Sequence, residues 1–208
     1  MEQGMTLITG ASAGIGKALA YQFASRGHDL IITARRSSVL KEIADDIMKR
    51  HAVAVTVDSG DIADREYVEH LCALLGQREV NVLINNAGFG DYSYPWDIDR
   101  KKAQQMVDVN ISALMHLSME YVRLYREQEA TLINVSSRGG YQLFSHMVPY
   151  CATKFYVSAL TEGLAGNLQQ AGSPMRVKAL VPGATESEFM SVAETGAVFR
   201  GSDIIPSD

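Results

Sequence analysis

Two residues that can exchange a proton, Tyr150 and Lys154, stand four positions apart in the stretch YCATK. On a helix this spacing puts both side chains on one face, so an ammonium group can lie beside a phenol. A neighbouring cation favours the phenolate and lowers the pKa of a tyrosine from its usual value of about 10. The pair predicts proton transfer near neutral pH. The alternative is an ordinary pair on a helix surface.

Two hydroxyls, Ser136 and Ser137, end the apolar run before this pair. Adjacent strand residues face opposite sides, so at most one of them points toward a site at the end of the strand. A serine there can hydrogen-bond the oxyanion that develops when a carbonyl group is reduced. The alternative for Ser137 is a cap of a turn or helix.

A glycine-rich turn follows the first apolar run, in the stretch TLITGASAGIGKALA. Gly10, Gly14 and Gly16 stand where side chains would obstruct the strand exit, the approach of a ligand to the backbone, and helix packing. The helix that starts near Ile15 offers free N–H groups and a positive dipole end to a pyrophosphate. The spacing differs from G-x-G-x-x-G, and a plain strand-helix turn is the alternative.

Short apolar segments alternate with amphipathic ones along the chain and would position these residues. Val, Ile and Leu dominate the apolar segments, as burial on both sheet faces requires, and the intervening helices imply parallel crossovers. We therefore predict an α/β fold with a doubly wound parallel sheet in a single domain over 1–208, in which 185–208 form a substrate loop. The predicted strands are 5–9, 29–34, 52–57, 80–85, 130–136 and 175–181, and the predicted helices are 15–26, 38–50, 63–76, 99–126 and 147–171.

Polar or glycine-rich residues follow every predicted strand: the glycine turn, then ARR, GDIAD, NNAG, SSRGGY and PGATES. In an open parallel sheet, ligands bind beyond the carboxyl ends of the strands. The sequence therefore predicts one site along this edge.

The chain resembles the short-chain dehydrogenase/reductase family through TGASAGIG, NNAG, the YCATK pair, Ser137 and the PG at Pro182 and Gly183. Through ARR after the second strand and PGATESEF after the sixth, the chain is similar to the DltE-like bacterial reductases. The resemblance implies a Rossmann fold of strand order 3-2-1-4-5-6, here without the usual seventh strand. We accordingly expect the natural gene product to be longer, or another segment or subunit to cover the edge of the sixth strand.

The resemblance also implies a catalytic tetrad of Asn110, Ser137, Tyr150 and Lys154. In it, Tyr150 is the general acid or base, Ser137 holds the substrate oxygen, Lys154 also holds the nicotinamide ribose, and Asn110 binds a relay water. For Asn110 the alternative is a polar residue in mid-helix without a role.

The residues after the second strand favour NADP(H) over NAD(H). Arg35 and Arg36 can neutralise a 2'-phosphate where NAD sites place an acid, and Ser12 can add a hydroxyl. Two solvated arginines are the alternative. Ala13 stands where the family often has a basic residue, which weakens the preference.

The remaining cofactor contacts follow from the resemblance. Asp61 and Ile62 would hold the adenine, although Asp61 can equally be a turn or cap residue. The backbone of the segment Asn86, Ala87 and Gly88 would lie beside the adenosine ribose. Alternatively, Asn85 and Asn86 only connect neighbouring strands. The full expected cofactor set is Gly10, Ser12, Ala13, Gly14, Ile15, Gly16, Arg35, Arg36, Asp61, Ile62, Asn86, Ala87, Gly88, Tyr150, Lys154, Pro182 and Gly183.

Composition excludes other classes of partner. The net charge of -5 opposes general attraction to nucleic acid or anionic membranes, and charged residues interrupt every apolar stretch before it reaches the length of a membrane span. The two cysteines have no metal-ligand spacing, so we expect no metal and a reducing cytoplasmic location.

We therefore predict an NADP(H)-dependent oxidoreductase that acts on a small carbonyl or alcohol substrate. The alternative is a protein that senses NADP(H), or serves as a scaffold, without turnover. Relatives pair the two long helices, so we expect a homodimer or homotetramer. The side chains that can wall an apolar substrate pocket, or can equally be packing residues, are Tyr92, Tyr94, Trp96, Phe144 and Met147, together with His146.

Overall fold

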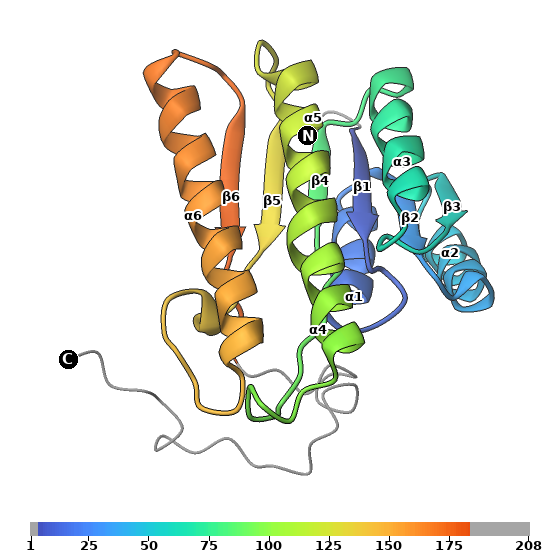
Figure 1. Ribbon diagram of the computed structural model, residues 1–208. Helices are drawn as coiled ribbons and strands as arrows, with labels where there is room; N and C mark the ends of the chain where they lie inside the picture. The colour runs from blue at the N-terminus through green and yellow to red at the C-terminus, as the bar shows by residue number, and fades with distance from the viewer. Residues whose placement is uncertain (1–3, 184–208) are drawn as a thin grey trace.

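A computed structural model describes residues 4–183; residues 1–3 and 184–208, which include the expected substrate loop at 185–208, lie outside the described part. One parallel sheet runs through the molecule in the order β3-β2-β1-β4-β5-β6, which confirms the predicted fold and strand order (Figure 1). The strands are β1 (Met5–Thr9), β2 (Asp29–Ala34), β3 (Val55–Ser59), β4 (Val82–Asn85), β5 (Thr131–Val135) and β6 (Arg176–Leu180).

Helices cover both faces of this sheet. In Figure 1, α3, α5 and α6 lie in front of it and α1 and α2 lie behind. The α-helices are α1 (Gly14–Ala24), α2 (Ser37–Arg50), α3 (Arg65–Gln77), α4 (Arg100–Val107), α5 (Leu114–Tyr125) and α6 (Val148–Gln170).

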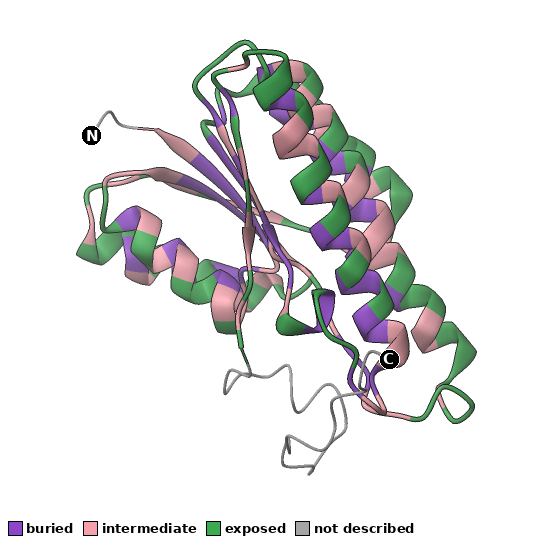
Figure 2. Ribbon diagram, turned by 90° about the vertical axis from the view of Figure 1, so that its left-hand side faces the viewer, coloured by how far each residue is buried: buried purple, intermediate pink, exposed green. Residues whose placement is uncertain are grey.

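Alternating apolar side chains along the central strands supply a core on each face. Leu7 of β1 packs with Leu71 of α3 and Leu117 of α5, whereas the next residue, Ile8, packs with Leu40 and Ile47 of α2. Each of these side chains is fully buried. Burial on both faces is why the central strands β1, β2 and β4 are largely apolar, whereas the edge strands β3 and β6 carry exposed polar residues. Figure 2 shows the exposed residues largely on the outer helix faces and loops.

Most predicted elements agree with the structure to within two residues at each end, and two differ more. The third strand is Val55–Ser59 and not 52–57, because Leu30 N–H pairs with Ala54 and the β2–β3 register begins at Val55. The predicted helix 99–126 is helical throughout, but a π-helical segment, η1 (Asp108–Ala113), separates α4 from α5. Asn110 lies in this segment.

Among residues 4–183, β6 pairs with β5 and ends the sheet. No helix within this range is long and apolar enough to cross a membrane.

Candidate active site

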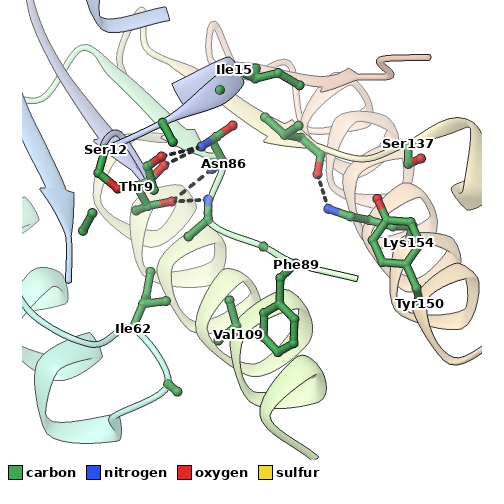
Figure 3. A pocket seen from close by; sticks show the side chains of 18 of the residues that line it. Thr9, Ser12, Ile15, Ile62, Asn86, Phe89, Val109, Ser137, Tyr150 and Lys154 are labelled. Carbon is green, nitrogen blue, oxygen red and sulfur yellow. Dashed lines mark hydrogen bonds between the residues drawn. The ribbon is translucent and has the colours of Figure 1, made fainter. Parts of the chain in front are cut away.

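A cleft of about 750 Å³ lies at the carboxyl ends of the strands. Seventeen of the nineteen residues predicted for the site line it; Gly16 and Asn110 do not. Figure 3 shows Thr9, Ser12 and Asn86 at one end and Ser137, Tyr150 and Lys154 at the other. The cleft therefore joins the glycine turn to the tyrosine-lysine pair.

The glycine turn is held tightly against the exit of β4. Gly10 has a φ of +67°, and a Cβ added to it would lie 2.8 Å from the Cα of Ala87. A Cβ on Gly16 would lie 2.5 Å from the carbonyl oxygen of Gly10. The Asn86 amide donates to the carbonyl oxygens of Thr9 at 2.9 Å and Gly10 at 3.2 Å. The side chain of Asn86 thus ties β4 to the turn.

The start of α1 faces the cleft without a side-chain cap. Its N-cap residue, Ala13, provides no capping hydrogen bond, and the first turn carries no acidic residue. Gly14 and Ile15 open the helix and line the cleft. The free N–H groups and dipole of such a helix start attract an anion. A backbone cradle of this kind fits the pyrophosphate of a dinucleotide.

Two exposed arginines line the cleft beside this turn. Arg36 donates to the hydroxyl of Ser12 from Nε at 3.3 Å and from Nη2 at 3.1 Å, which places it and Ser12 together. Across the same end, Asp61 Oδ1 accepts the Ala63 N–H at 3.0 Å, a turn contact, while Ile62 also lines the cleft. This end combines positive charge with an apolar wall.

Tyr150 and Lys154 are buried side by side at the other end, on α6. Burial raises the pKa of Tyr150 to about 12, and a hydrogen bond with Ser137 opposes that shift. Burial lowers the pKa of Lys154 to about 8. Lys154 Nζ donates to the Val135 carbonyl oxygen at 2.8 Å and lies 5.8 Å from the centre of the Tyr150 ring.

The prediction that Lys154 lowers the pKa of Tyr150 is therefore wrong for this structure. The ammonium group is directed to the end of β5 and not to the phenol oxygen, and the loss of water around both groups outweighs their interaction. Each group is pushed toward its neutral form.

The structure places Ser137, and not Ser136, beside Tyr150. Ser136 Oγ shares a hydrogen bond of 2.8 Å with Ser158 Oγ and donates to the Lys154 carbonyl oxygen at 3.3 Å, so it packs against α6. Ser137 Oγ accepts the Gly139 N–H at 3.1 Å at the start of the short 3-10 helix η2 (Arg138–Gly140).

Asn110 lies beneath the cleft floor. Its Oδ1 accepts the Phe89 N–H at 3.1 Å, and its Nδ2 donates to the Phe89 carbonyl at 2.9 Å and to Thr153 Oγ1 at 3.0 Å. These bonds join the loop after β4 to α6. The side chain is therefore committed to protein partners, and its role in a water relay stays a prediction.

Sequence reasoning missed one wall of the cleft. Lys102 and Gln105 of α4 and Val109 of η1 line it, as does Phe89. Residues three and four positions apart share a helix face, so the spacing of 102, 105 and 109 was the available signal. The spacing does not show, however, whether that helix face points toward the cleft.

The expected apolar walls divide into two groups. Phe144 and Met147 line the cleft, whereas Tyr92, Tyr94 and Trp96 are absent from its described lining. Instead, the His146 ring stacks on Tyr92 at 5.2 Å and lies 4.0 Å from Tyr94, and Trp96 stacks on Tyr94 at 4.7 Å between ring centres. Within 4–183, no group of three His, Cys, Asp or Glu side chains is placed to hold a metal ion.

Comparisons with known proteins agree with this geometry. A sequence profile of the short chain dehydrogenase family matches residues 4–196. Sulfoacetaldehyde reductase 2 of Chromohalobacter salexigens is 32% identical over 209 residues, which cover 98% of this chain and 81% of that protein. Serine 3-dehydrogenase of Agrobacterium fabrum is 31% identical over 204 residues, 96% of this chain and 79% of that one.

A solved relative shares the fold closely. The short-chain dehydrogenase from Sphingobium yanoikuyae in complex with NADPH superposes with a TM-score of 0.87 at 29% identity, covering 92% of this chain and 75% of that one. Sequence profile, curated relatives and structure coincide over nearly all of the described residues. The chain belongs to the short chain dehydrogenase family, and it is a dehydrogenase or reductase by descent.

Proposed function

We propose that this protein is an NADP(H)-dependent oxidoreductase that transfers hydride between the nicotinamide and a small carbonyl or secondary alcohol substrate, with Tyr150 as general acid and base. The observation that carries the proposal is the convergence of Ser137, Tyr150 and Lys154 at one end of the cleft whose other end holds the glycine cradle. A family with NADP-bound members supports it.

The cofactor would lie along the cleft, with its pyrophosphate on the start of α1. Arg35 and Arg36 would neutralise the 2'-phosphate, Ile62 would contact the adenine, and Lys154 would hold the nicotinamide ribose. Pro182 and Gly183, which follow β6 and line the cleft, would close the nicotinamide end. When bound, the nicotinamide supplies the hydride for reduction or accepts it in oxidation.

The chain's own residues would supply a proton and position the substrate oxygen that receives it. With a pKa of about 12, Tyr150 is protonated at neutral pH and can donate its proton to a carbonyl oxygen. Ser137, hydrogen-bonded to Tyr150, would hold the same oxygen as negative charge develops on it. Asn110 would hold the relay water that links Lys154 to bulk solvent, and this relay would return a proton to Tyr150.

The relatives bear on the substrate. Two are named for sulfoacetaldehyde and serine, which are small polar molecules. A site walled by Phe144 and Met147 beside Tyr150 suits a substrate of this size. We accordingly assign a small carbonyl compound as the substrate class.

Self-association is part of the proposal. Met119 of α5 is 53% exposed and Phe155 of α6 is 39% exposed. Apolar side chains on the outer helix layer favour a covered surface, so we expect a homodimer or homotetramer. Light scattering at micromolar concentration tests this, and a monomeric mass would contradict it.

Two measurements test the activity. Calorimetry should give a lower Kd for NADPH than for NADH, and NADPH absorbance should fall when ketones, aldehydes and diketones are added one at a time. Binding of NADPH without its oxidation by any member of a broad panel would instead support a nucleotide sensor.

A further inference from the structure

One cation of the cleft, Arg138, has no task in the proposed binding of the cofactor. It follows Ser137 directly and lines the cleft. Its N–H donates to the Pro182 carbonyl oxygen at 3.3 Å, and a Cβ built on Gly183 would lie 4.0 Å from its Cδ. The side chain therefore runs along the strand-six exit, at the catalytic end.

The backbone that carries Arg138 is fixed against α6. A Cβ on Gly139 would lie 3.3 Å from Cys151 Sγ and 3.5 Å from Cε1 of Tyr150, and one on Gly140 would lie 2.6 Å from the Lys154 carbonyl oxygen. At Gly140 only glycine allows so close an approach. Arg138 thus starts from a point held rigidly beside the proton donor.

The guanidinium group itself is exposed and reaches no carboxylate among residues 4–183. Its described side-chain hydrogen bond is from Nη2 to Gln142 Oε1 at 3.4 Å, a long contact with a neutral group. Lys102, another cation of the cleft, is by contrast ion-paired with Asp91 at 2.6 Å. The positive charge of Arg138 is therefore available to a ligand.

Charge in the described lining is strongly one-sided. Asp61 is its acidic member, against Arg35, Arg36, Lys102, Arg138 and Lys154, in a chain whose net charge is -5. Arg35 and Arg36 lie at the opposite end, and Lys154 is buried on the Val135 carbonyl. Arg138 is thus the exposed cation at the catalytic end of this lining.

We propose that Arg138 is a specificity-determining residue that binds an acidic group of the substrate, so that the substrate is a small anionic carbonyl compound, an oxo acid or oxo sulfonate. A guanidinium group presents parallel N–H donors that match the oxygens of a carboxylate or sulfonate. Because Arg138 directly follows Ser137 and lines the same cleft, the acidic group of the substrate would lie close to the carbonyl that Ser137 would hold. The inference rests on the proposed hydride transfer.

A substrate pair that differs only in charge tests this. NADPH-dependent reduction of acetoacetate and of its methyl ester is measured for the natural protein, Arg138→Gln, Arg138→Lys and a control, Arg126→Gln, whose arginine pairs with Glu127 at the end of α5. A parallel arm with sulfoacetaldehyde and neutral propanal distinguishes sulfonate from carboxylate.

In Arg138→Gln, kcat/KM for the preferred anion should fall about tenfold to a hundredfold, mainly through KM, as expected for a lost charged hydrogen bond. The kcat/KM for the neutral substrate, the Kd of NADPH and the melting temperature should stay at the values of the control variant. Arg138→Lys should restore part of the loss, because it keeps the charge but not the fork geometry.

Three results overturn the inference while leaving the proposed function intact: equal use of charged and neutral partners by the natural protein, an equal loss for both in Arg138→Gln, or turnover of neutral ketones alone. A raised Kd for NADPH in Arg138→Gln assigns the residue to the cofactor and also overturns it. Absence of NADPH oxidation with every compound overturns both proposals.

Discussion

The two ends of the cleft solve different problems with different degrees of burial. Arg35 and Arg36, at the end proposed for the phosphates, are exposed, whereas the exposed fractions of Tyr150 and Lys154 are only 6% and 5%. An exposed arginine is always charged and can meet a phosphate with little loss of hydration. A buried phenol and amine change their proton affinities instead. In the proposed function, this difference separates cofactor recognition from proton transfer within one continuous cleft.

The largest effect should come from the buried end. Tyr150→Phe removes the proton donor and should lower turnover about a hundredfold to ten-thousandfold, while the Kd of NADPH stays near its natural value. Stopped-flow and calorimetry measure the two quantities. Tyr141→Phe is the matched control, because that exposed tyrosine bonds Glu162 at 2.6 Å outside the described cleft lining. Natural turnover in Tyr150→Phe would remove Tyr150 as the acid.

Burial of Lys154 should be visible as a pH dependence of stability. Its folded pKa of about 8 lies below the unfolded value of 10.5, so between these values the unfolded chain binds more protons and stability rises with pH. Relative to Lys154→Met, the protein without cofactor should gain about 3 kcal/mol from pH 7 to 11. Denaturant unfolding at several pH values measures this difference.

The variant Lys178→Met serves as the control for that measurement, since Lys178 is exposed on β6. It should leave the pH profile unchanged. A profile of Lys154→Met that runs parallel to the natural one would show that the amine is hydrated, and the contrast between the two ends would then fail.

The exposed end should give a smaller, purely electrostatic effect. Arg35→Ala or Arg36→Ala should weaken NADPH binding by about 1.5 to 3 kcal/mol and leave NADH binding nearly unchanged. The loss should shrink as salt is raised, because exposed charges are screened. Calorimetry at two salt concentrations measures it, and equal losses for both cofactors would contradict a phosphate contact.

The glycine cradle offers the smallest test. Gly16→Ala forces a Cβ against the Gly10 carbonyl and should destabilise the fold by about 1 to 3 kcal/mol, with weaker NADPH binding. Gly163→Ala, in an open part of α6, should instead stabilise by about 0.5 to 1 kcal/mol. Thermal melting of both variants measures this contrast. Equal shifts of the melting temperature in the two variants would contradict the prediction.

Sequence reasoning recovered the sheet because its signal is local. The apolar strands and the residues after them place the site without knowledge of packing, and so does the register of Tyr150 and Lys154 on α6. Properties that depend on neighbours distant in sequence were not accessible. The pKa of Tyr150 depends on how much water the fold removes, and the separation of Arg138 from the acidic side chains of residues 4–183 depends on which loops meet.

The same limit explains the aromatic residues after β4. Their position after NNAG made Tyr92, Tyr94 and Trp96 candidate pocket walls, on the same footing as Phe144 and Met147, which lie between Ser137 and Tyr150. The structure shows instead that the first two meet the His146 ring, whose residue has a φ of +63°. No residue near His146 in the sequence predicts that its backbone adopts a left-handed conformation.

The π-helical segment η1 sets the rotational phase between α4 and α5. Each residue turns a helix by about 100°, so a one-residue deletion within Asp108–Ala113 would swing Lys102 and Gln105 off the cleft while α5 kept its buried tyrosines. Such a deletion would therefore change which side chains of α4 line the cleft, and it would also displace Met106, which packs with Phe144 and Tyr150, while the core around α5 stayed in place. In this chain, the number of residues between α4 and α5 thus sets the shape of one cleft wall.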